Sequence, residues 1–263
     1  MVSDSKQPLL HVVMLGSFPP QCQGVHDYCA GLVPPLSTLC RVTGIGFKRM
    51  YPGALFPGVK SAMDATNTPL AGEHLEVKHP LTWYNPFGWL YTASTTPGDL
   101  FHLQWWSLPL FPIAFCFVVL MKLRAKPVVV TVHNVLPHEG SRLFVFAGRT
   151  LCQLADKVIV HSDINVEQIV DAYGLRKDKV HKVHLGVRTD KTSSDAPPKS
   201  QAEARSALNL PVDADIALLF GTIRPYKGVR TALEALTLLV EKNPRMHLVI
   251  AGVDVFRLNF AHG

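Results

Sequence analysis

The sequence predicts an α/β fold, with a doubly wound parallel sheet in a Rossmann-like first domain and the start of a second domain of the same kind. Short apolar runs alternate with longer segments of helical periodicity, the rhythm of βαβ units around a parallel sheet. Residues 127–132 are apolar almost throughout (Val-Val-Val-Thr-Val), as expected of a strand buried on both faces. The rhythm stops at a polar stretch and restarts near residue 216, which indicates a second unit.

The expected elements follow one another regularly along the chain. The runs predicted to be strands lie at residues 9–15, 41–47, 100–103, 127–132, 157–160, 180–184, 216–220 and 248–251. Helical spacing and stop signals predict helices at 25–38, 108–124, 142–154, 163–172 and 229–240. Residues 51–98 are rich in Pro, Gly, Thr and Asn and show no clear period. Right-handed crossovers between such strands give a doubly wound sheet.

Composition divides the chain into two domains. We expect an N-terminal Rossmann-like domain at 1–187, a linker at 188–206 and a partial second Rossmann-like domain at 207–263. The last part holds one βαβ unit, which by itself leaves sheet edges exposed. The sequence therefore predicts a truncated chain, or one half of a split pair.

The composition excludes several classes of protein. With 48% hydrophobic and 17% charged residues among 263, the chain is globular rather than disordered. The longest apolar run, 108–121, contains two prolines and is shorter than the roughly 20 residues that span a bilayer. Five cysteines at irregular spacing, without a Cys-x-x-Cys pair, predict free thiols and a cytoplasmic location.

The net charge of +6 favours anionic partners or simply gives a solvated basic surface. Lys122, Arg124 and Lys126 follow the apolar run 108–121. This segment is then either a peripheral contact with an anionic membrane face or a buried crossover helix with basic residues at its end.

The turn from residue 220 to 228 carries the strongest chemical signal. It follows a predicted strand, precedes a helix and contains Arg224 and Lys227 between two glycines. Free amide N–H groups at a helix N-terminus attract phosphate, and two added cations suit a diphosphate. The alternative is that both are solvated loop cations.

Two other places at the ends of strands are candidates. The loop Gly16-Ser17-Phe18-Pro19-Pro20 to Gly24 lets a ligand approach the backbone or is an ordinary turn, and it lacks the Gly-x-Gly-x-x-Gly fingerprint of dinucleotide sites. His133 ends a central strand, where binding side chains gather in this architecture, although a lone histidine is more often structural. His161 ends the next strand and is a weaker candidate.

Together and in this order, these motifs resemble the retaining glycosyltransferases of family 4, which have the GT-B architecture of two Rossmann-like domains. The resemblance covers residues 9–252. Its motifs are Gly-Ser-Phe-Pro-Pro, Val-Val-Val-Thr-Val-His-Asn, Ala-Asp-Lys-Val-Ile-Val-His-Ser, Val-His-Leu-Gly-Val and Phe-Gly-Thr-Ile-Arg-Pro-Tyr-Lys-Gly.

The resemblance implies roles for particular residues. Arg224 and Lys227 would hold the donor diphosphate and stabilise the leaving charge, and His133 would face the transferred sugar. Gly24 would lie near the donor phosphate. Ser17, Pro20 and His26 are expected on the acceptor side or in the loop.

The resemblance also implies a reaction and its partners. The donor would be a UDP- or GDP-linked hexose, and the acceptor a glycan or lipid-linked molecule, with retention at the anomeric carbon. Neither a cofactor nor a metal is expected, and nucleic acid is not an expected partner.

Two departures from the family pattern keep other hypotheses open. The N-terminal loop has a single glycine, Gly24, where the family has a pair, and the Glu-x7-Glu motif of the second domain is missing, since no two glutamates lie eight apart. We therefore expect this truncated chain alone to transfer sugar poorly or not at all, and a non-catalytic fragment that binds the acceptor or a partner is the alternative function. A nicotinamide-dependent enzyme is a third, which the missing fingerprint disfavours.

Overall fold

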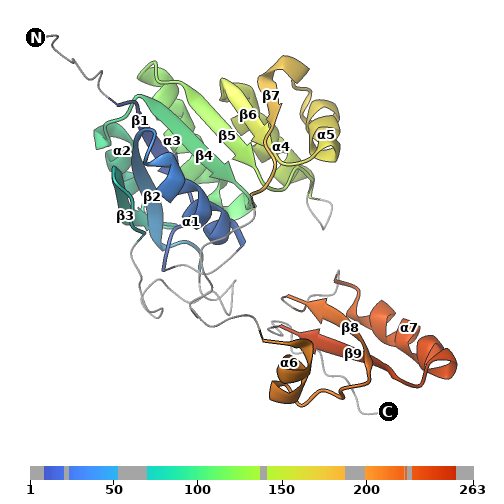
Figure 1. Cartoon of the computed structure of the whole chain (residues 1–263). Helices are drawn as coiled ribbons and strands as arrows, with labels where there is room; N and C mark the ends of the chain where they lie inside the picture. The colour runs from blue at the N-terminus through green and yellow to red at the C-terminus, as the bar shows by residue number, and fades with distance from the viewer. Residues whose placement is uncertain are drawn as a thin grey trace, which may run out of the picture. The chain divides into compact units, whose positions relative to one another are not determined.

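A computed structural model describes residues 9–20, 24–52, 70–136, 141–186, 199–221, 223 and 227–252 (Figure 1). The chain divides into two compact units, Met1–Thr189 and Asp190–Gly263. The first unit holds a large sheet with helices on both faces, and the second holds a two-stranded sheet.

The sheet of the first unit has seven parallel strands, in the order β3-β2-β1-β4-β5-β6-β7. The predicted α/β class and doubly wound parallel sheet are confirmed, including the parallel pairing of the strands at 128–132 and 157–160. The strands are β1 (His11–Leu15), β2 (Arg41–Arg49), β3 (Leu75–Thr82), β4 (Leu100–Trp105), β5 (Val128–Val132), β6 (Lys157–Val160) and β7 (Val180–Lys182).

The strand order reverses between β1 and β4. From β1 the chain moves outward through β2 to β3, then returns to β4 on the other side of β1 and continues to β7. In open sheets of this kind, ligands bind outside the carboxyl ends of the strands at such a reversal. The topology therefore directs attention to the ends of β1 and β4.

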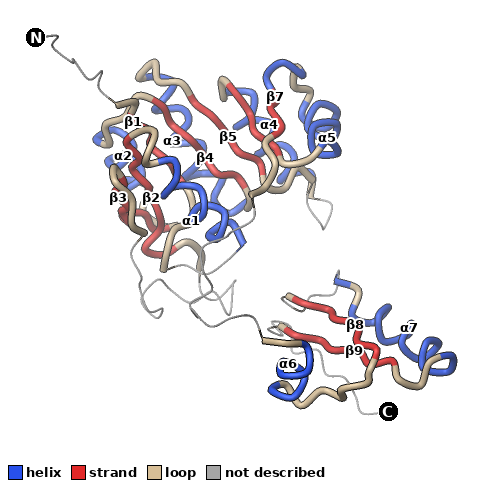
Figure 2. Tube along the Cα trace, in the orientation of Figure 1, coloured by secondary structure: helices blue, strands red, loops and turns tan. Residues whose placement is uncertain are grey.

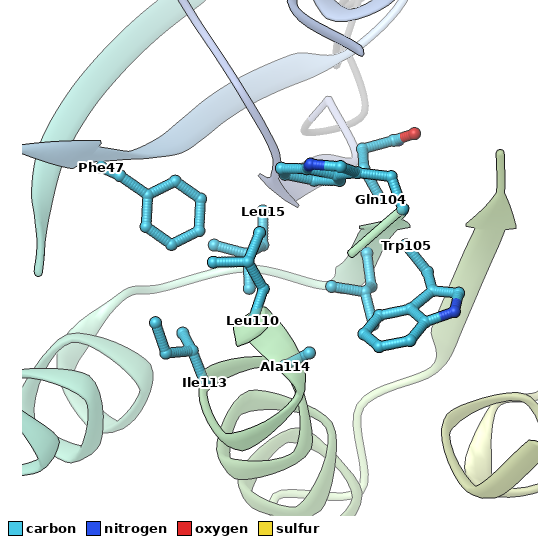
Figure 3. Close-up of a pocket in the computed structure, with 9 residues that line it drawn as sticks. Leu15, Phe47, Gln104, Trp105, Leu110, Ile113 and Ala114 are labelled. Carbon is cyan, nitrogen blue, oxygen red and sulfur yellow. The ribbon is translucent and has the colours of Figure 1, made fainter. Parts of the chain in front are cut away.

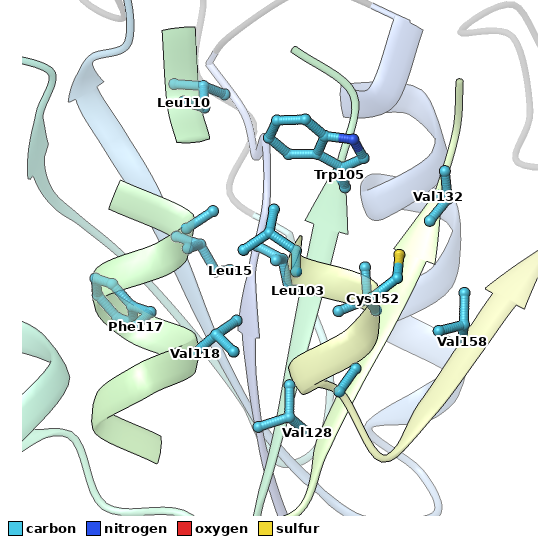
Figure 4. Close-up of a cluster of buried hydrophobic side chains, with 14 of the residues drawn as sticks. Leu15, Leu103, Trp105, Leu110, Phe117, Val118, Val128, Val132, Cys152 and Val158 are labelled. Carbon is cyan, nitrogen blue, oxygen red and sulfur yellow. The ribbon is translucent and has the colours of Figure 1, made fainter. Parts of the chain in front are cut away.

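Helices cover the two faces of the sheet unequally (Figures 1 and 2). One face packs on α1 (Gly24–Leu36), where Cys29 and Val33 join Met14 and Val42 in a small apolar cluster. The other face packs on a row of four helices, which supply the main core (Figure 4). These are α2 (Pro86–Thr95), α3 (Phe111–Leu123), α4 (Arg142–Leu154) and α5 (Asp163–Tyr173).

Local sequence signals set several helix ends. Ser141 and Ser162 accept hydrogen bonds from the amides of Phe144 and Asn165, which caps the first turns of α4 and α5. Gly174, at φ 63°, ends α5 in the left-handed conformation that glycine adopts without strain.

Two elements lie in the region 51–98, for which no period was evident. β3 alternates in burial and contains a proline, and α2 is built of weak helix formers. Tertiary contacts stabilise them, because Ala93 is buried in the core and the Trp89 indole donates to the Thr82 carbonyl at 2.6 Å. The periodicity of the sequence does not reveal these tertiary contacts, which is why β3 and α2 were not predicted.

The second unit contains one βαβ element. Strands β8 (Asp215–Phe220) and β9 (Met246–Ala251) pair in parallel and are joined through α7 (Val229–Lys242). A short helix, α6 (Gln201–Ala207), begins inside the range 188–206 that composition assigned to a linker. Ser200 and Glu203 form a capping box that starts this helix, so that part of the range is helical.

The apolar segment 108–121 forms a short 3-10 turn, η1 (Leu108–Leu110), followed by α3. One side of α3, with Ile113, Phe117 and Met121, is buried against the sheet. The basic residues at the end of α3 interact with other groups of the same unit; for example, Lys122 forms a salt bridge with Asp156 at 2.7 Å. The buried-crossover alternative therefore describes this helix, and among the described residues no helix is long and apolar enough to cross a membrane.

We predict that Gly148→Ala destabilises the first unit although alanine is the better helix former. A Cβ at Gly148 in α4 would lie 2.8 Å from Cζ of Tyr173 and 3.0 Å from Nε1 of Trp105, both buried. Overpacking of this kind costs about 1–3 kcal/mol, more than the roughly 1 kcal/mol gained in helix propensity.

Urea unfolding followed by circular dichroism measures this change. Gly186→Ala is the control, because a Cβ there meets nothing within 4 Å and should leave the free energy of unfolding unchanged within about 0.5 kcal/mol. A Gly148→Ala protein as stable as the parent would show that α4 and α5 do not pack as described.

Candidate active site

Three aromatic rings meet at the carboxyl edge of the sheet. His133 follows β5, His161 follows β6, and Tyr28 comes from α1. The ring centroids of Tyr28 lie 4.8 Å from His133 and 5.1 Å from His161, and the two histidine rings are 5.4 Å apart. Residues from three elements thus form one cluster beside the strand reversal.

The backbone fixes both histidines. The amide of His133 donates to the Trp105 carbonyl at 3.0 Å, which extends the pairing of β4 with β5 by one step. The Nδ1 atom of His161 lies 2.8 Å from the Val183 carbonyl. Because a carbonyl only accepts, Nδ1 of His161 carries the proton and donates it.

A buried polar row runs below His133 on the α1 face of the sheet. His133 Nε2 lies 2.9 Å from Gln104 Oε1, Gln104 Nε2 lies 3.2 Å from His102 Nε2, and His102 Nε2 lies 2.8 Å from Thr131 Oγ1. Gln104 and Thr131 are paired residues of β4 and β5, and His102 and His133 stand diagonally to them. Side chains at every second position of neighbouring strands reach one another in this way.

Burial keeps these histidines neutral. It lowers the pKa of His133 to about 3, with smaller contributions from the neighbouring His161 and His102. Burial alone lowers the pKa of His102 to about 4. Desolvation disfavours the charged imidazole, so at neutral pH the edge offers uncharged donors and acceptors. Such groups suit the hydroxyls of a polyol.

The loop after β1 lies against the same row. A Cβ at Gly16 would approach the Cys29 sulfur to 2.9 Å and Gln104 Cγ to 3.1 Å, so glycine allows this close packing. Ser17 is buried, whereas Pro20 is half-buried. Gly24 begins α1, and His26 lies half-buried in its first turn. Whether these four contact an acceptor or a phosphate stays a prediction.

The turn before α7 belongs to the second unit. Lys227 is exposed and directly precedes Gly228, the residue at which α7 begins, with φ 73°. Its position beside a helix N-terminus suits an anion. Arg224 lies outside the described residues.

Other residues that the sequence suggested as candidates pack against neighbouring side chains in the structure. Trp105 is buried in the main core, and Trp83 and Tyr84 contact each other edge to face. Leu15, Phe47 and Ile113 line a narrow apolar pocket on the α3 side of the sheet (Figure 3). Within the described ranges, no group of three metal-binding side chains occurs.

Sequence reasoning found two members of the cluster and missed the rest. His133 and His161 were candidates, and the structure places their rings in contact. Tyr28, His102 and Gln104 were missed. The available signal was the alternation in β4, where His102 and Gln104 are the two polar positions of Leu-Phe-His-Leu-Gln-Trp and share one face.

The fold is similar to that of solved glycosyltransferases of the GT-B type. The chain aligns with HepE from Anabaena, solved with UDP and glucose, at a TM-score of 0.59 and 15% identity, covering 93% of this chain and 61% of HepE. A glycosyltransferase from Rickettsia africae aligns at a TM-score of 0.58 and 14% identity, and the alignment covers 94% of this chain and 69% of that protein. At these identities the likeness is one of fold.

Residues 67–191, slightly less than half of the chain, match the sequence model of Glycosyltransferase Family 4.

Curated proteins that are named glycosyltransferases are similar to part of the chain. The D-inositol 3-phosphate glycosyltransferase of Saccharomonospora viridis is 33% identical over 102 residues, which are 37% of this chain and 23% of the relative. The enzyme of the same name from Streptomyces avermitilis is 35% identical over 98 residues, which are 36% of this chain and 20% of the relative. The matched parts span less than a quarter of the length of these relatives.

We predict that the first unit loses stability as the pH falls below about 6.5. Unfolded histidine titrates near 6.5, whereas folded His133 and His102 stay neutral to about 3 and 4. In this window the unfolded chain binds more protons, so the free energy of unfolding decreases toward acid. The loss is roughly 2 kcal/mol per histidine at pH 5.

Urea unfolding at pH 7.5, 6, 5 and 4.5 measures this slope. His133→Gln should make it shallower, while His181→Gln, at an exposed position of β7, should leave it unchanged. Equal slopes in the parent and in His133→Gln would contradict a neutral buried His133.

Proposed function

We propose that this protein is a glycosyltransferase that moves a hexosyl unit from a UDP- or GDP-sugar to a glycan or lipid-linked acceptor, with retention at the anomeric carbon. The observation that carries the proposal is the neutral cluster of Tyr28, His133 and Gln104 at the strand reversal of a family 4 fold. A strand reversal is where this architecture binds ligands.

The site chemistry fits a sugar. A neutral imidazole whose Nε2 is bound to Gln104 still offers Nδ1 to a hydroxyl group, whereas a cation there would select anions. The low pKa of His133 keeps it in this form at every physiological pH. His133 therefore binds and orients the hexose in this proposal, and it does not act as a general base.

The leaving group needs positive charge. When the glycosidic bond to the diphosphate breaks, negative charge develops on the departing phosphate oxygen. We assign its stabilisation to Lys227 and Arg224, which precede the N-terminus of α7. In this proposal the two cations and the amides at the helix N-terminus supply this charge without a metal ion.

The relatives support the class of donor and acceptor. HepE was solved with UDP-glucose, and the curated relatives are named D-inositol 3-phosphate glycosyltransferases. A nucleotide-sugar donor and a glycan or lipid-linked acceptor with free hydroxyl groups are the partners proposed here. A non-catalytic fragment that binds only the acceptor is the alternative, and the same assay separates the two.

We predict that Lys227→Ala and Arg224→Ala each lower turnover of the donor by roughly 10²–10³, because each removes one preorganised contact to the developing charge. The assay measures release of UDP or GDP from a panel of nucleotide sugars, with and without polyol acceptors. Lys242→Ala, in the last turn of the same helix, is the control and should keep the parental rate.

Unchanged turnover in both variants would remove these cations from the mechanism. Binding of acceptors without any release of nucleotide by the parent protein would favour the non-catalytic alternative.

We also propose a peripheral contact with the cytoplasmic face of a membrane, through α2 rather than α3. Phe87 and Tyr91 are 81% and 72% exposed and lie one helical turn apart, with Leu90 beside them. Aromatic side chains on one face of a surface helix are typical of interfacial binding, and the net charge of +6 favours anionic lipids.

We predict that replacing Phe87 and Tyr91 with Asp abolishes cosedimentation with anionic liposomes. Two carboxylates would have to enter the headgroup region beside negative lipids. Leu39→Asp, at an equally exposed apolar position, is the control and should still bind. Equal partition of the parent protein with and without liposomes would refute the contact.

A further inference from the structure

The polar row on β4 and β5 is a continuous chain of hydrogen bonds. It runs from His133 Nε2 through the Gln104 amide to His102 Nε2 and on to Thr131 Oγ1, at 2.9, 3.2 and 2.8 Å. Thr131 also forms a hydrogen bond with the Tyr28 side chain. The two links to His102 are buried, with Gln104 2% exposed and Thr131 fully buried, whereas the link between His133 and Gln104 is part-buried.

The orientation of the Gln104 side-chain amide determines which ring nitrogen of His133 and of His102 carries the proton. Its oxygen faces His133 and can only accept, so Nε2 of His133 carries a proton. Its nitrogen faces His102 and can only donate, so Nε2 of His102 has none. The two histidines therefore hold opposite neutral tautomers, and turning the amide by half a revolution would reverse both.

Packing holds Gln104 in place. Gly16 approaches Gln104 so closely that an added Cβ would sit 3.1 Å from its Cγ. The strand pairing of Gln104 with Thr131 fixes the other side. A buried amide between two imidazoles has no water with which to exchange partners, so leaving either link unmade costs a desolvated polar group.

We propose that Gln104 is a positioning residue that holds His133 in the Nε2–H tautomer, so that Nδ1 is a hydrogen-bond acceptor for a sugar hydroxyl. His133 would then contact the ligand, and Gln104 would act only through it. The ligand part rests on the proposed function, whereas the tautomers are a property of this chain alone.

The tautomer of His133 depends on Gln104 rather than on the other described groups that contact the His133 ring. Tyr28 and His161 contact the His133 ring through their own rings, and the Nδ1 proton of His161 is engaged by Val183. His102 is neutral, so it places no charge beside His133 at neutral pH. The hydrogen bond between His133 and Gln104 then sets the tautomer of His133.

The test is nitrogen-15 NMR of histidine-labelled protein at pH 7, with signals assigned by single His→Gln variants. In the wild type we expect His133 protonated at Nε2 and His102 protonated at Nδ1. The reversed pair, or a mixture at His133, would overturn the proposal.

Two substitutions at Gln104 separate the two histidines. Gln104→Glu offers acceptors only, so His102 should gain an Nε2 proton while His133 keeps its tautomer. Gln104→Met offers neither, so His133 should become a mixture of tautomers. Gln153→Glu, at an exposed position of α4, is the control and should change neither signal. A His133 tautomer that survives in Gln104→Met would overturn the role of Gln104.

Kinetics test the consequence for the ligand. We expect Gln104→Met to lower kcat/KM for the donor about tenfold, the effect of one lost hydrogen bond, and Gln104→Glu to lose less. A changed tautomer with unchanged kcat/KM would refute the positioning role. Absence of turnover in the wild type, with both tautomers as assigned, would instead refute the proposed function, so the two failures are distinguishable.

Discussion

The parallel hydrogen-bonded sheet is the constraint on which the rest of the first unit depends. Parallel pairing brings the carboxyl ends of all seven strands to one edge, and the reversal between β1 and β4 opens that edge to a ligand. The register then sets residues from β4 and β5 opposite each other, so Gln104 and Thr131 meet. The site is thus a consequence of strand order and register before any loop contributes.

A buried polar row inside an apolar sheet is costly unless every member has a partner. Here the partners come from diagonal positions of two strands, and α1 covers them with Tyr28. The same burial that demands these partners lowers the pKa of His133 and His102. Structural order and the neutral character of the edge therefore share one cause, which links the acid sensitivity of the fold to its capacity for binding hydroxyl groups.

The two units carry different chemistry. The first offers neutral donors and acceptors at its strand ends, and the second places Lys227 at the start of α7. Neutral imidazoles suit a sugar, and a cation beside helix amides suits a phosphate. A nucleotide sugar contains both kinds of group, so the match to Glycosyltransferase Family 4 and the local chemistry lead to the same proposal.

The sequence by itself determined the fold class, most strand positions and the prominence of His133, because a continuous apolar run and a polar residue at its end are local signals. It missed β3 and α2, whose weak propensities are overridden by packing of residues such as Ala93 and Trp89. It also missed Tyr28, His102 and Gln104. Their role depends on strand order, register and the position of α1, and these are set by contacts between residues far apart in the chain, so only the tertiary structure decided them.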